Sequence, residues 1–332
     1  MTKSWLPIPM ETEFRSCPIC SGSDCSVLLE FDSFGFRLRT VECKRCGLLY
    51  LNPAPTREFL NNFYRFQYRY FYEGVRRIDN RYVTSRCHAE IAAARVARYR
   101  SFLALGASVL DVGCGTGFFL NAARESCGAV VEGIEPDPIT ADYCEQLRLN
   151  VFRGFLEQYP TSEQFDCVAA FHIIEHIADL QQFLTLLKRR LRRNGYLFVE
   201  TPNCAGSWDG IGMFHIAHLQ TFSPRTIANL LSVHGFDIVE AGAIESDVES
   251  SNLYVVACLS KHTKELIAAD MAESALISEK CRRIRSRRIV RVFRTWAKWL
   301  YFRVGGVQPA RFRRTKGRRS SIVSNRSDIW RH

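Results

Sequence analysis

The chain has 332 residues, of which 47% are hydrophobic, and a formal net charge of +11. This length accommodates one full α/β domain with smaller attachments. No run of about 18 apolar residues is present, and the N-terminus lacks the apolar core of a signal peptide, so the sequence predicts a cytoplasmic protein rather than a membrane-spanning or secreted one.

Two pairs of cysteines mark the N-terminal segment. Cys17 and Cys20 form one C-x2-C motif, and Cys43 and Cys46 form a second one after 22 intervening residues. Four thiolates brought together by a short hairpin give the tetrahedral sulfur site that zinc prefers, with no coordination position left for a substrate. We therefore predict a structural zinc ribbon; two disulfides or two redox pairs are the alternative.

An aromatic-rich segment follows the cysteine motifs. A turn with two prolines indicates a linker, and a helix is expected to begin near Thr56, whose side chain could cap it. Tyr68, Tyr70 and Tyr72 either line the mouth of a binding site or pack this helix onto its neighbour. A further helix is expected over residues 82–104.

The stretch SVLDVGCGTG is the strongest signal in the sequence. Gly113, Gly115 and Gly117 follow a short apolar strand that contains Asp111. Glycine permits positive φ and lets backbone N–H groups approach a ligand, and a helix is expected to begin directly behind the loop. A dinucleotide-binding fingerprint would require glycine at position 118, where this chain has Phe118, so a nicotinamide cofactor is disfavoured.

A second acid, Glu135, lies 24 residues after Asp111. An acid at about this spacing falls at the end of the next parallel strand, where it can accept both ribose hydroxyls of a nucleoside. Together the motifs resemble those of class I S-adenosylmethionine-dependent methyltransferases over roughly residues 80–260. The resemblance implies S-adenosylmethionine as the cofactor. The cofactor-binding residues that it indicates are Asp111, Gly113, Cys114, Gly115, Gly117, Glu135, Pro136, Phe155 and Leu156.

Strands and helices alternate through the rest of this region. The pattern predicts an α/β fold with a doubly wound, mostly parallel seven-stranded sheet, Rossmann-like, with ligands at its carboxyl edge. The expected domains are a zinc ribbon (1–52), a linker and helical cap (53–105), the cofactor-binding methyltransferase domain (106–260) and a basic helical tail (261–332).

Polar residues gather where the methyl acceptor should bind. His172, Glu175 and His176 share a face if their segment is helical, and His218 follows further along the chain. One interpretation makes His176 or His218 the general base for an acceptor hydroxyl, with Glu175 orienting it. A bound divalent metal that lowers the pKa of the hydroxyl is a second interpretation, and buried or helix-capping residues without a catalytic role are a third.

The same cluster resembles the Glu-x-x-Glu-His pattern of ubiquinone-type O-methyltransferases and of small-RNA terminal 2′-O-methyltransferases. In those families a downstream histidine completes a magnesium site, which implies a second divalent metal at His172, Glu175, His176 and His218 here. The present sequence departs from the pattern, because His172 stands where the first glutamate would be. Histidine suits zinc, iron or manganese better than magnesium.

The order of parts, a zinc ribbon in front of this domain, resembles the zinc-ribbon methyltransferases of bacterial surface-polysaccharide and deoxysugar pathways. The resemblance implies O-methylation of a sugar or lipid-linked glycan hydroxyl, so the expected partner is a small-molecule or glycan acceptor. Two alternatives remain. One is an RNA methyltransferase with a metal-assisted site, and the other is a methyltransferase-fold module that binds the nucleoside without catalysis.

The tail concentrates the positive charge. Residues 261–332 have a net charge of +15, whereas residues 1–260 have −4. Residues 282–304 place apolar side chains on one helical stripe and basic ones on another, which favours peripheral contact with an anionic membrane. A nucleic acid is a less favoured partner for the same charges, and a solvated tail or a helix packed on its own domain is the remaining interpretation.

Overall fold

The computed structural model describes residues 10–33, 36–68, 77–208, 211–244, 251–262 and 264–286. Its largest element is a seven-stranded sheet with the strand order β12-β13-β10-β9-β6-β7-β8. Only β13 runs against its neighbours, which confirms a mostly parallel sheet. The strands are β6 (Ser108–Val112), β7 (Val130–Glu135), β8 (Asn150–Arg153), β9 (Phe165–Phe171), β10 (Leu191–Pro202), β12 (Phe236–Ile244) and β13 (Asn252–Leu259).

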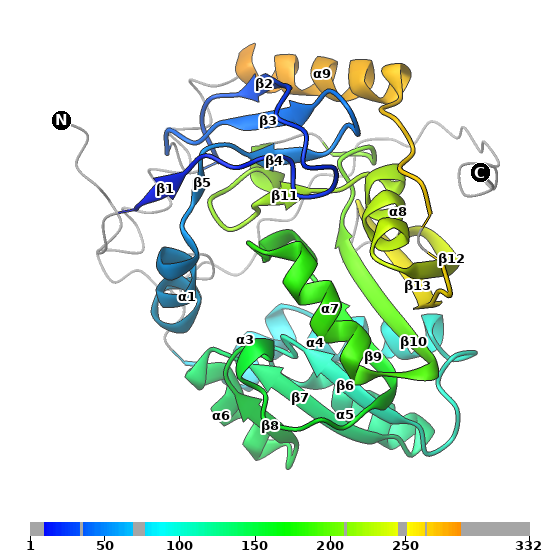
Figure 1. Cartoon of the computed structure of the whole chain (residues 1–332). Helices are drawn as coiled ribbons and strands as arrows, with labels where there is room; N and C mark the ends of the chain where they lie inside the picture. Colours follow the sequence, from blue (N-terminus) through cyan, green and yellow to red (C-terminus); the bar gives the residue numbers. More distant parts are fainter. Residues whose placement is uncertain are drawn as a thin grey trace, which may run out of the picture.

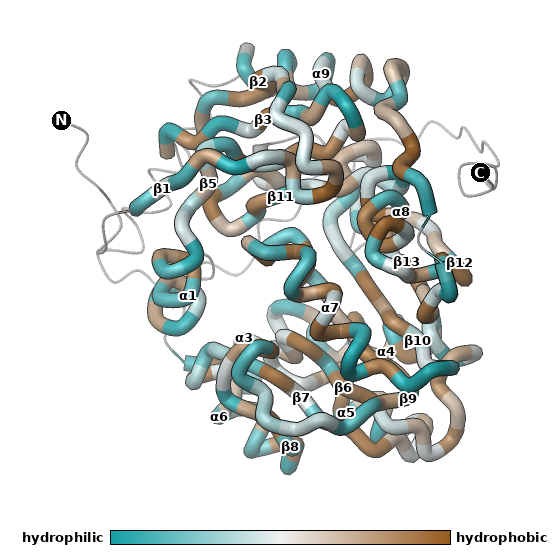
Figure 2. The backbone as a smooth tube through the Cα atoms, in the orientation of Figure 1, coloured by the Kyte–Doolittle hydropathy of each residue, from teal (hydrophilic) through white to brown (hydrophobic). Residues whose placement is uncertain are grey.

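Helices cover both faces of this sheet, as Figure 1 shows. Alternate residues of one strand point to opposite faces, so Val109 of β6 joins the core under α4 and α5, whereas Leu110 joins the core under α7 and α8. Figure 2 shows hydrophobic residues concentrated along β6, β9 and β10. The helices are α3 (Asn80–Ser85), α4 (His88–Arg98), α5 (Phe118–Cys127), α6 (Pro138–Gln146), α7 (Leu180–Arg190) and α8 (Pro224–Val233), with short 3-10 turns η1 (Leu156–Gln158), η2 (Ile174–His176) and η3 (Ile211–Met213).

One expected helix is two. The sequence predicts a helix over residues 82–104, but α3 ends at Ser85, α4 begins at His88, and α4 itself ends at Arg98. Cys87 between them adopts a left-handed conformation with φ of 55°, which interrupts the helix. The break allows the His88 ring to bond Thr116 Oγ1 of the glycine loop at 2.7 Å.

Local capping signals fix several helix starts. Thr56 Oγ1 accepts from the N–H of Phe59 at the start of α1 (Arg57–Phe66), as expected from the sequence. Ser223 forms a capping box with Thr226, and Pro224 occupies the first turn of α8. These helices therefore begin where short-range chemistry places them.

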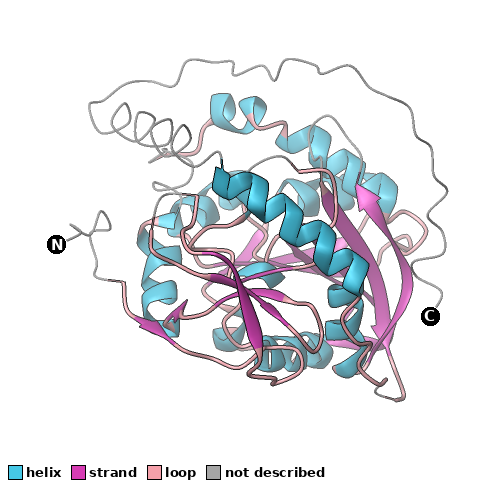
Figure 3. Ribbon diagram, turned by 90° about the horizontal axis from the view of Figure 1, so that it is seen from above, coloured by secondary structure: helices cyan, strands magenta, loops and turns pink. Residues whose placement is uncertain are grey.

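The cysteine segment builds a smaller sheet that also contains a strand from the second half of the chain. Its order is β11-β4-β3-β2, in which β11 pairs antiparallel with β4. The helix α9 (Met271–Ser286) lies along the outside of this sheet, where Ile277, Cys281 and Ile284 pack against Leu28 and Leu29 (Figures 1 and 3). The remaining strands are β1 (Thr12–Glu13), β2 (Cys25–Leu29), β3 (Thr40–Cys43), β4 (Leu49–Leu51), β5 (Ala54–Pro55) and β11 (Gln220–Thr221).

Some predictions fall elsewhere. Tyr70, Tyr72 and residues 287–304 of the expected basic helix lie outside the described residues. Within the part of the chain that the structure describes, no helix combines the length and the apolar character needed to cross a lipid bilayer.

Candidate functional site

The glycine loop joins β6 to α5. Gly113, Gly115 and Gly117 have φ values of +72°, +55° and +73°, in the left-handed region that disfavours other residues. A Cβ atom on Gly113 would fall 2.2 Å from Cδ1 of Ile173, and one on Gly117 would fall 2.4 Å from Cδ1 of Leu149. All three positions therefore favour glycine for their conformation, and Gly113 and Gly117 also leave no space for a side chain.

Glu135 holds the loop together from the next strand. Its Oε2 accepts from the N–H of Gly115 at 2.9 Å, and its Oε1 accepts from the N–H of Asp137 at 2.8 Å. A carboxylate oxygen has a second lone pair, so these bonds leave acceptor capacity for a ribose hydroxyl. The ribose contact of Glu135 remains a prediction.

Asp111 is a buried carboxyl group at the end of β6. Its Oδ1 has no hydrogen-bond partner among the described residues, although the side chain is only 3% exposed. Burial raises the pKa of Asp111 to about 8, with Arg95 lowering it and Glu135 and Glu200 raising it further. Such an orphaned acceptor fits a ligand that brings a cationic donor, as the ammonium group of S-adenosylmethionine would.

A cavity of about 120 Å³ lies beside the loop. Four of the predicted cofactor residues line it, namely Gly113, Pro136, Phe155 and Leu156, together with His176. Cys114 is not among the lining residues. Its side chain packs against Gly133 of β7, where an added Cβ atom would lie 2.6 Å from the Cys114 Sγ. Helix α1 contributes Arg57, Leu60, Asn61 and Tyr64 to the lining of the cavity.

Glu175 of the turn η2 contacts His172 on one side and lies close to His176 and His218 on the other. His172 has a left-handed backbone with φ of 56°, and its Nδ1 lies 3.4 Å from Glu175 Oε1. One donor atom from each of Glu175, His176 and His218 lies within 4.8 Å of the others, and His172 does not belong to that group. His172 is thus a charge partner of Glu175 and not a fourth member of the cluster.

Backbone carbonyls fix the tautomers of the two neighbouring histidines. Nδ1 of His176 lies 2.7 Å from the carbonyl oxygen of Ala217, and Nδ1 of His218 lies 2.7 Å from that of Met213. A carbonyl oxygen only accepts, so both Nδ1 atoms carry the proton in the neutral rings. Each Nε2 then has a lone pair that can accept a proton or bind a metal.

Burial and neighbouring charges shift the pKa values of these four side chains. Burial raises the pKa of Glu175, but its contact with His172 and the nearby histidines lower it to about 2. Burial lowers the pKa of His172, yet the Glu175 carboxylate outweighs this and raises it. Burial also lowers the pKa of His176, and it lowers that of His218 to about 3. Glu175 thus favours the charged form of His172, and burial favours the neutral forms of His176 and His218.

Two supporting residues, Tyr64 and Gln220, escaped the sequence analysis. The Tyr64 hydroxyl lies 3.0 Å from His176 Nδ1 and donates to the Ala217 carbonyl at 3.2 Å. Gln220 Nε2 donates to the carbonyls of Ile174 and Ile177, which bracket η2. No short-range pattern marks Tyr64 or Gln220, because each reaches η2 from a distant part of the chain.

A buried ion-pair network lies under the same edge of the sheet. Glu200 of β10 is fully buried and accepts from Arg95 at 2.7 Å, Arg98 at 2.5 Å and the Tyr99 hydroxyl at 2.9 Å. The backbone carbonyl of Glu200 also accepts from the N–H of His172. Arg95 and Arg98 therefore connect α4 to β10, next to the acceptor-side turn.

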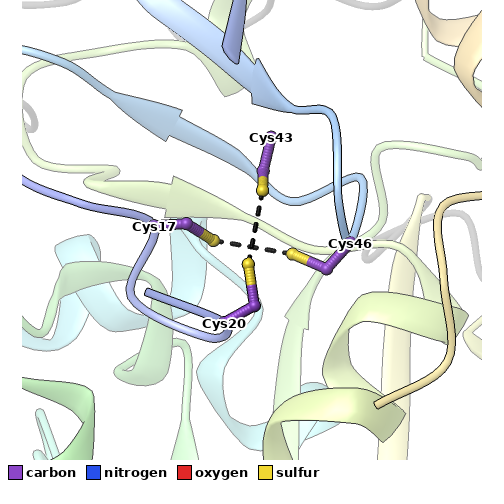
Figure 4. A group of neighbouring side chains, drawn as sticks. All are labelled: Cys17, Cys20, Cys43 and Cys46. Atoms are coloured by element: carbon purple, nitrogen blue, oxygen red, sulfur yellow. Dashed lines mark hydrogen bonds between the residues drawn. The ribbon is translucent and has the colours of Figure 1, made fainter. Parts of the chain in front are cut away.

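The four cysteines of the two motifs converge on one point (Figure 4). The Sγ atoms of Cys17 and Cys46 are 3.5 Å apart, those of Cys20 and Cys43 are 3.4 Å apart, and all four lie within 4.8 Å. Four thiolates around Zn²⁺ at about 2.3 Å need a separation of this size, so the donor set fits a structural zinc ion. Arg225 of α8 donates to the Cys46 carbonyl and pairs with Glu273 of α9, which anchors the second motif.

Comparison with known proteins identifies the central region. Residues 84–241 match a family model described as a methyltransferase domain. Over these residues the chain is similar to methyltransferase domains. The matched residues include neither the cysteine motifs nor the basic tail.

Curated relatives match parts of the same region. The human mitochondrial ubiquinone biosynthesis O-methyltransferase is 30% identical over 46% of this chain and 42% of its own length. The (S)-coclaurine N-methyltransferase of Papaver somniferum is 32% identical over 34% of each chain. This chain therefore spans about two fifths or less of these two relatives.

Solved structures also align with part of the chain, at lower sequence identity. An S-adenosylmethionine-dependent methyltransferase from Archaeoglobus fulgidus gives a TM-score of 0.44 at 21% identity, covering 54% of this chain and 99% of that one. The magnesium protoporphyrin IX methyltransferase from Synechocystis gives 0.46 at 15% identity, covering 62% and 100%.

Proposed function

We propose that this protein transfers a methyl group from S-adenosylmethionine to a hydroxyl group of a sugar or lipid-linked glycan. The observation that carries the proposal is the position of His176. It lines the cavity beside the glycine loop, and its Nδ1 proton bonds the Ala217 carbonyl, so the lone pair is on Nε2. Methyl transfer needs alignment of the acceptor and removal of one proton from it.

The chain supplies both needs. Asp111 and Glu135 would hold opposite ends of the cofactor, which brings an activated methyl group when bound. His176 Nε2 would accept the proton of the acceptor hydroxyl. Tyr64 and the Ala217 carbonyl hold the His176 ring in place. The Glu175 carboxylate would stabilise the positive charge on His176 once it takes the proton, whereas His172 acts in the opposite sense.

Relatives support the general reaction more than the acceptor. Ubiquinone biosynthesis O-methyltransferases match the domain, which supports oxygen as the methylated atom, whereas the (S)-coclaurine enzyme is named as an N-methyltransferase. The sugar or glycan acceptor is supported by the zinc-ribbon arrangement of the sequence, and the four converging cysteines agree with that arrangement.

Replacing His176 with Asn tests the proposal. We expect transfer of a radiolabelled methyl group to a panel of nucleotide-linked and lipid-linked sugars to fall by about 10²–10⁴-fold, because general-base catalysis has this magnitude. Cofactor affinity, measured by calorimetry, should not change. The exposed His262 provides the matched control, His262→Asn. Full turnover by His176→Asn would show that His176 is not the base.

A metal-assisted mechanism is the second candidate. The donor atoms of Glu175, His176 and His218 lie close enough to bind one ion, which would lower the pKa of an acceptor hydroxyl. Metal analysis of the purified protein separates the two mechanisms. We expect about one zinc per chain from the four cysteines. A second equivalent that is lost in His218→Asn would favour the metal.

A further inference from the structure

We propose that the methyl acceptor is a phosphorylated sugar and that its sugar phosphate binds to the outward face of α1. This inference rests on the proposed function and names the substrate class of the same site. An open groove of about 540 Å³ runs along α1, outside the smaller cavity beside the glycine loop. Arg57, Asn61 and Phe155 line both spaces, so a ligand in the groove can extend toward His176.

The groove is polar because α1 buries its apolar face elsewhere. Phe59, Leu60 and Phe63 pack with Ile216 and Leu219, which leaves the opposite face of the helix for the groove. That face presents the side-chain amides of Asn61 and Asn62 and the carboxylate of Glu58. Amides both donate and accept hydrogen bonds, and a carboxylate accepts them, so together they suit a molecule with several hydroxyl groups.

The two arginines of the groove differ in their partners. Arg57 is engaged at both ends, donating to Glu157 at 2.7 Å and to Gln182 at 2.9 Å. Among the residues that the structure describes, Arg65 donates to the Gln158 amide oxygen at 3.2 Å and forms no ion pair with a carboxylate. A planar guanidinium with donors to spare is well suited to bind a phosphate.

An aromatic ring completes the arrangement. The Arg65 guanidinium lies over the Phe155 ring, 5.4 Å from its centroid, and Gln158 Oε1 accepts from both Arg65 and the backbone N–H of Phe155. Glu58 and Arg65 are seven residues apart on one helix, or about 10 Å. Asn61 and Asn62 lie between these two side chains along the helix, so the groove places hydroxyl-binding groups beside a phosphate-binding group, an arrangement that suits a phosphorylated sugar.

Calorimetric titration of the full-length protein, saturated with S-adenosylhomocysteine, tests this. The probes are glucose, glucose 1-phosphate, UDP-glucose and a short-chain polyprenyl diphosphate glucose. We expect the phosphorylated probes to bind and glucose to bind more weakly. Arg65→Gln should weaken the phosphorylated probes about tenfold, as expected for loss of a charge-assisted hydrogen bond. The relative affinities of UDP-glucose and the lipid-linked probe distinguish a soluble acceptor from a membrane-bound one.

Arg189→Gln, at an exposed position in the last turn of α7, is the matched control and should bind every probe as the unmodified protein does. Equal affinity of Arg65→Gln and the unmodified protein for the phosphorylated probes would overturn the inference, as would no binding of any phosphorylated probe by protein that binds the nucleoside. Failure to bind the nucleoside itself would instead contradict the proposed function.

Discussion

Asp111 is the residue whose chemistry is most at odds with its surroundings. An unfolded Asp has a pKa of about 3.9, whereas burial raises that of folded Asp111 to about 8. Burial therefore favours the neutral form of Asp111 in the free protein, and the group must ionise to pair with a cationic ligand. Three charged groups act on it, Arg95, Glu135 and Glu200, and burial outweighs the one favourable charge among them.

We expect cofactor affinity to rise with pH. Each pH unit below the pKa of Asp111 reduces the ionised fraction of its carboxyl group about tenfold. Cofactor affinity should therefore increase by at least about tenfold between pH 6 and pH 8. Calorimetry in buffers of different ionisation enthalpy would also detect the released proton. Asp111→Asn should bind weakly at every pH, and its affinity should not follow this trend. Constant affinity of the unmodified protein from pH 6 to 8 would contradict the prediction.

The stability of the fold should change with pH in the opposite direction to cofactor affinity. The raised pKa of folded Asp111 favours folding fully at pH values below the unfolded pKa, where the carboxyl group is protonated in both states. This contribution is lost as the pH rises from the unfolded pKa through the folded pKa. Between about pH 4 and pH 8 ionisation of Asp111 therefore makes folding progressively less favourable. We expect Asp111→Asn to melt at a higher temperature than the unmodified protein at pH 8, with a smaller difference at pH 4. Equal melting temperatures at both pH values would count against the buried, unpaired carboxylate.

At the scale of elements, the contact between η2 and β11 positions the acceptor-side residues. Gln220 of β11 donates to the carbonyls of Ile174 and Ile177 at 2.9 Å and 2.8 Å. The N–H of Leu219 donates to the Glu175 carbonyl at 2.8 Å. Because β11 is only two residues long, it depends on its pairing with β4 to hold its position.

Gln220→Ala should loosen this turn. Two buried carbonyls would lose their partners, which costs at least about 2 kcal/mol in the free energy of unfolding. We expect slower methyl transfer with unchanged cofactor affinity, because the glycine loop lies on a different strand. Chemical denaturation, single-turnover assays and calorimetry measure the three quantities. The exposed Gln164→Ala is the control, and a Gln220→Ala protein with normal turnover would show that η2 keeps its shape without β11.

How far the sequence predicts the molecule depends on the range of each interaction. The glycine loop, the caps at Thr56 and Ser223 and the cysteine pairs are encoded within a few neighbouring residues, and the structure has them. The Cys87 break was not predictable, because it accompanies a bond between His88 and Thr116 of a distant loop. The sequence likewise placed His172 with His176 and His218, since helical spacing gives no sign of its left-handed backbone.

Across the whole molecule, the smaller sheet connects the cysteine site to the acceptor side. Cys43 ends β3, β3 pairs with β4, and β4 pairs with β11, whose flanking residues include His218 and the contacts to η2. Arg15 adds a second link, donating to the Leu219 carbonyl at 2.6 Å and to Gln220. The larger sheet, which forms the glycine loop, shares the core on one face with the cysteine segment, whereas the core on its other face contains no residue of that segment. Metal at the cysteines should therefore affect the two halves of the site unequally.

Removing zinc tests this asymmetry. Without the metal, four thiols packed within 4.8 Å lose the ion that holds them together, so the smaller sheet should loosen and release β11. We expect a lower melting temperature and a large loss of methyl transfer after chelation, with cofactor affinity reduced much less. Cys43→Ser should behave in the same way, whereas Cys25→Ser, outside the four-cysteine group, should retain zinc and activity. Because the strand chain runs from β3 through β4 to β11 and stops short of β6, an equal loss of cofactor binding and turnover would mean that the smaller sheet supports the glycine loop as well.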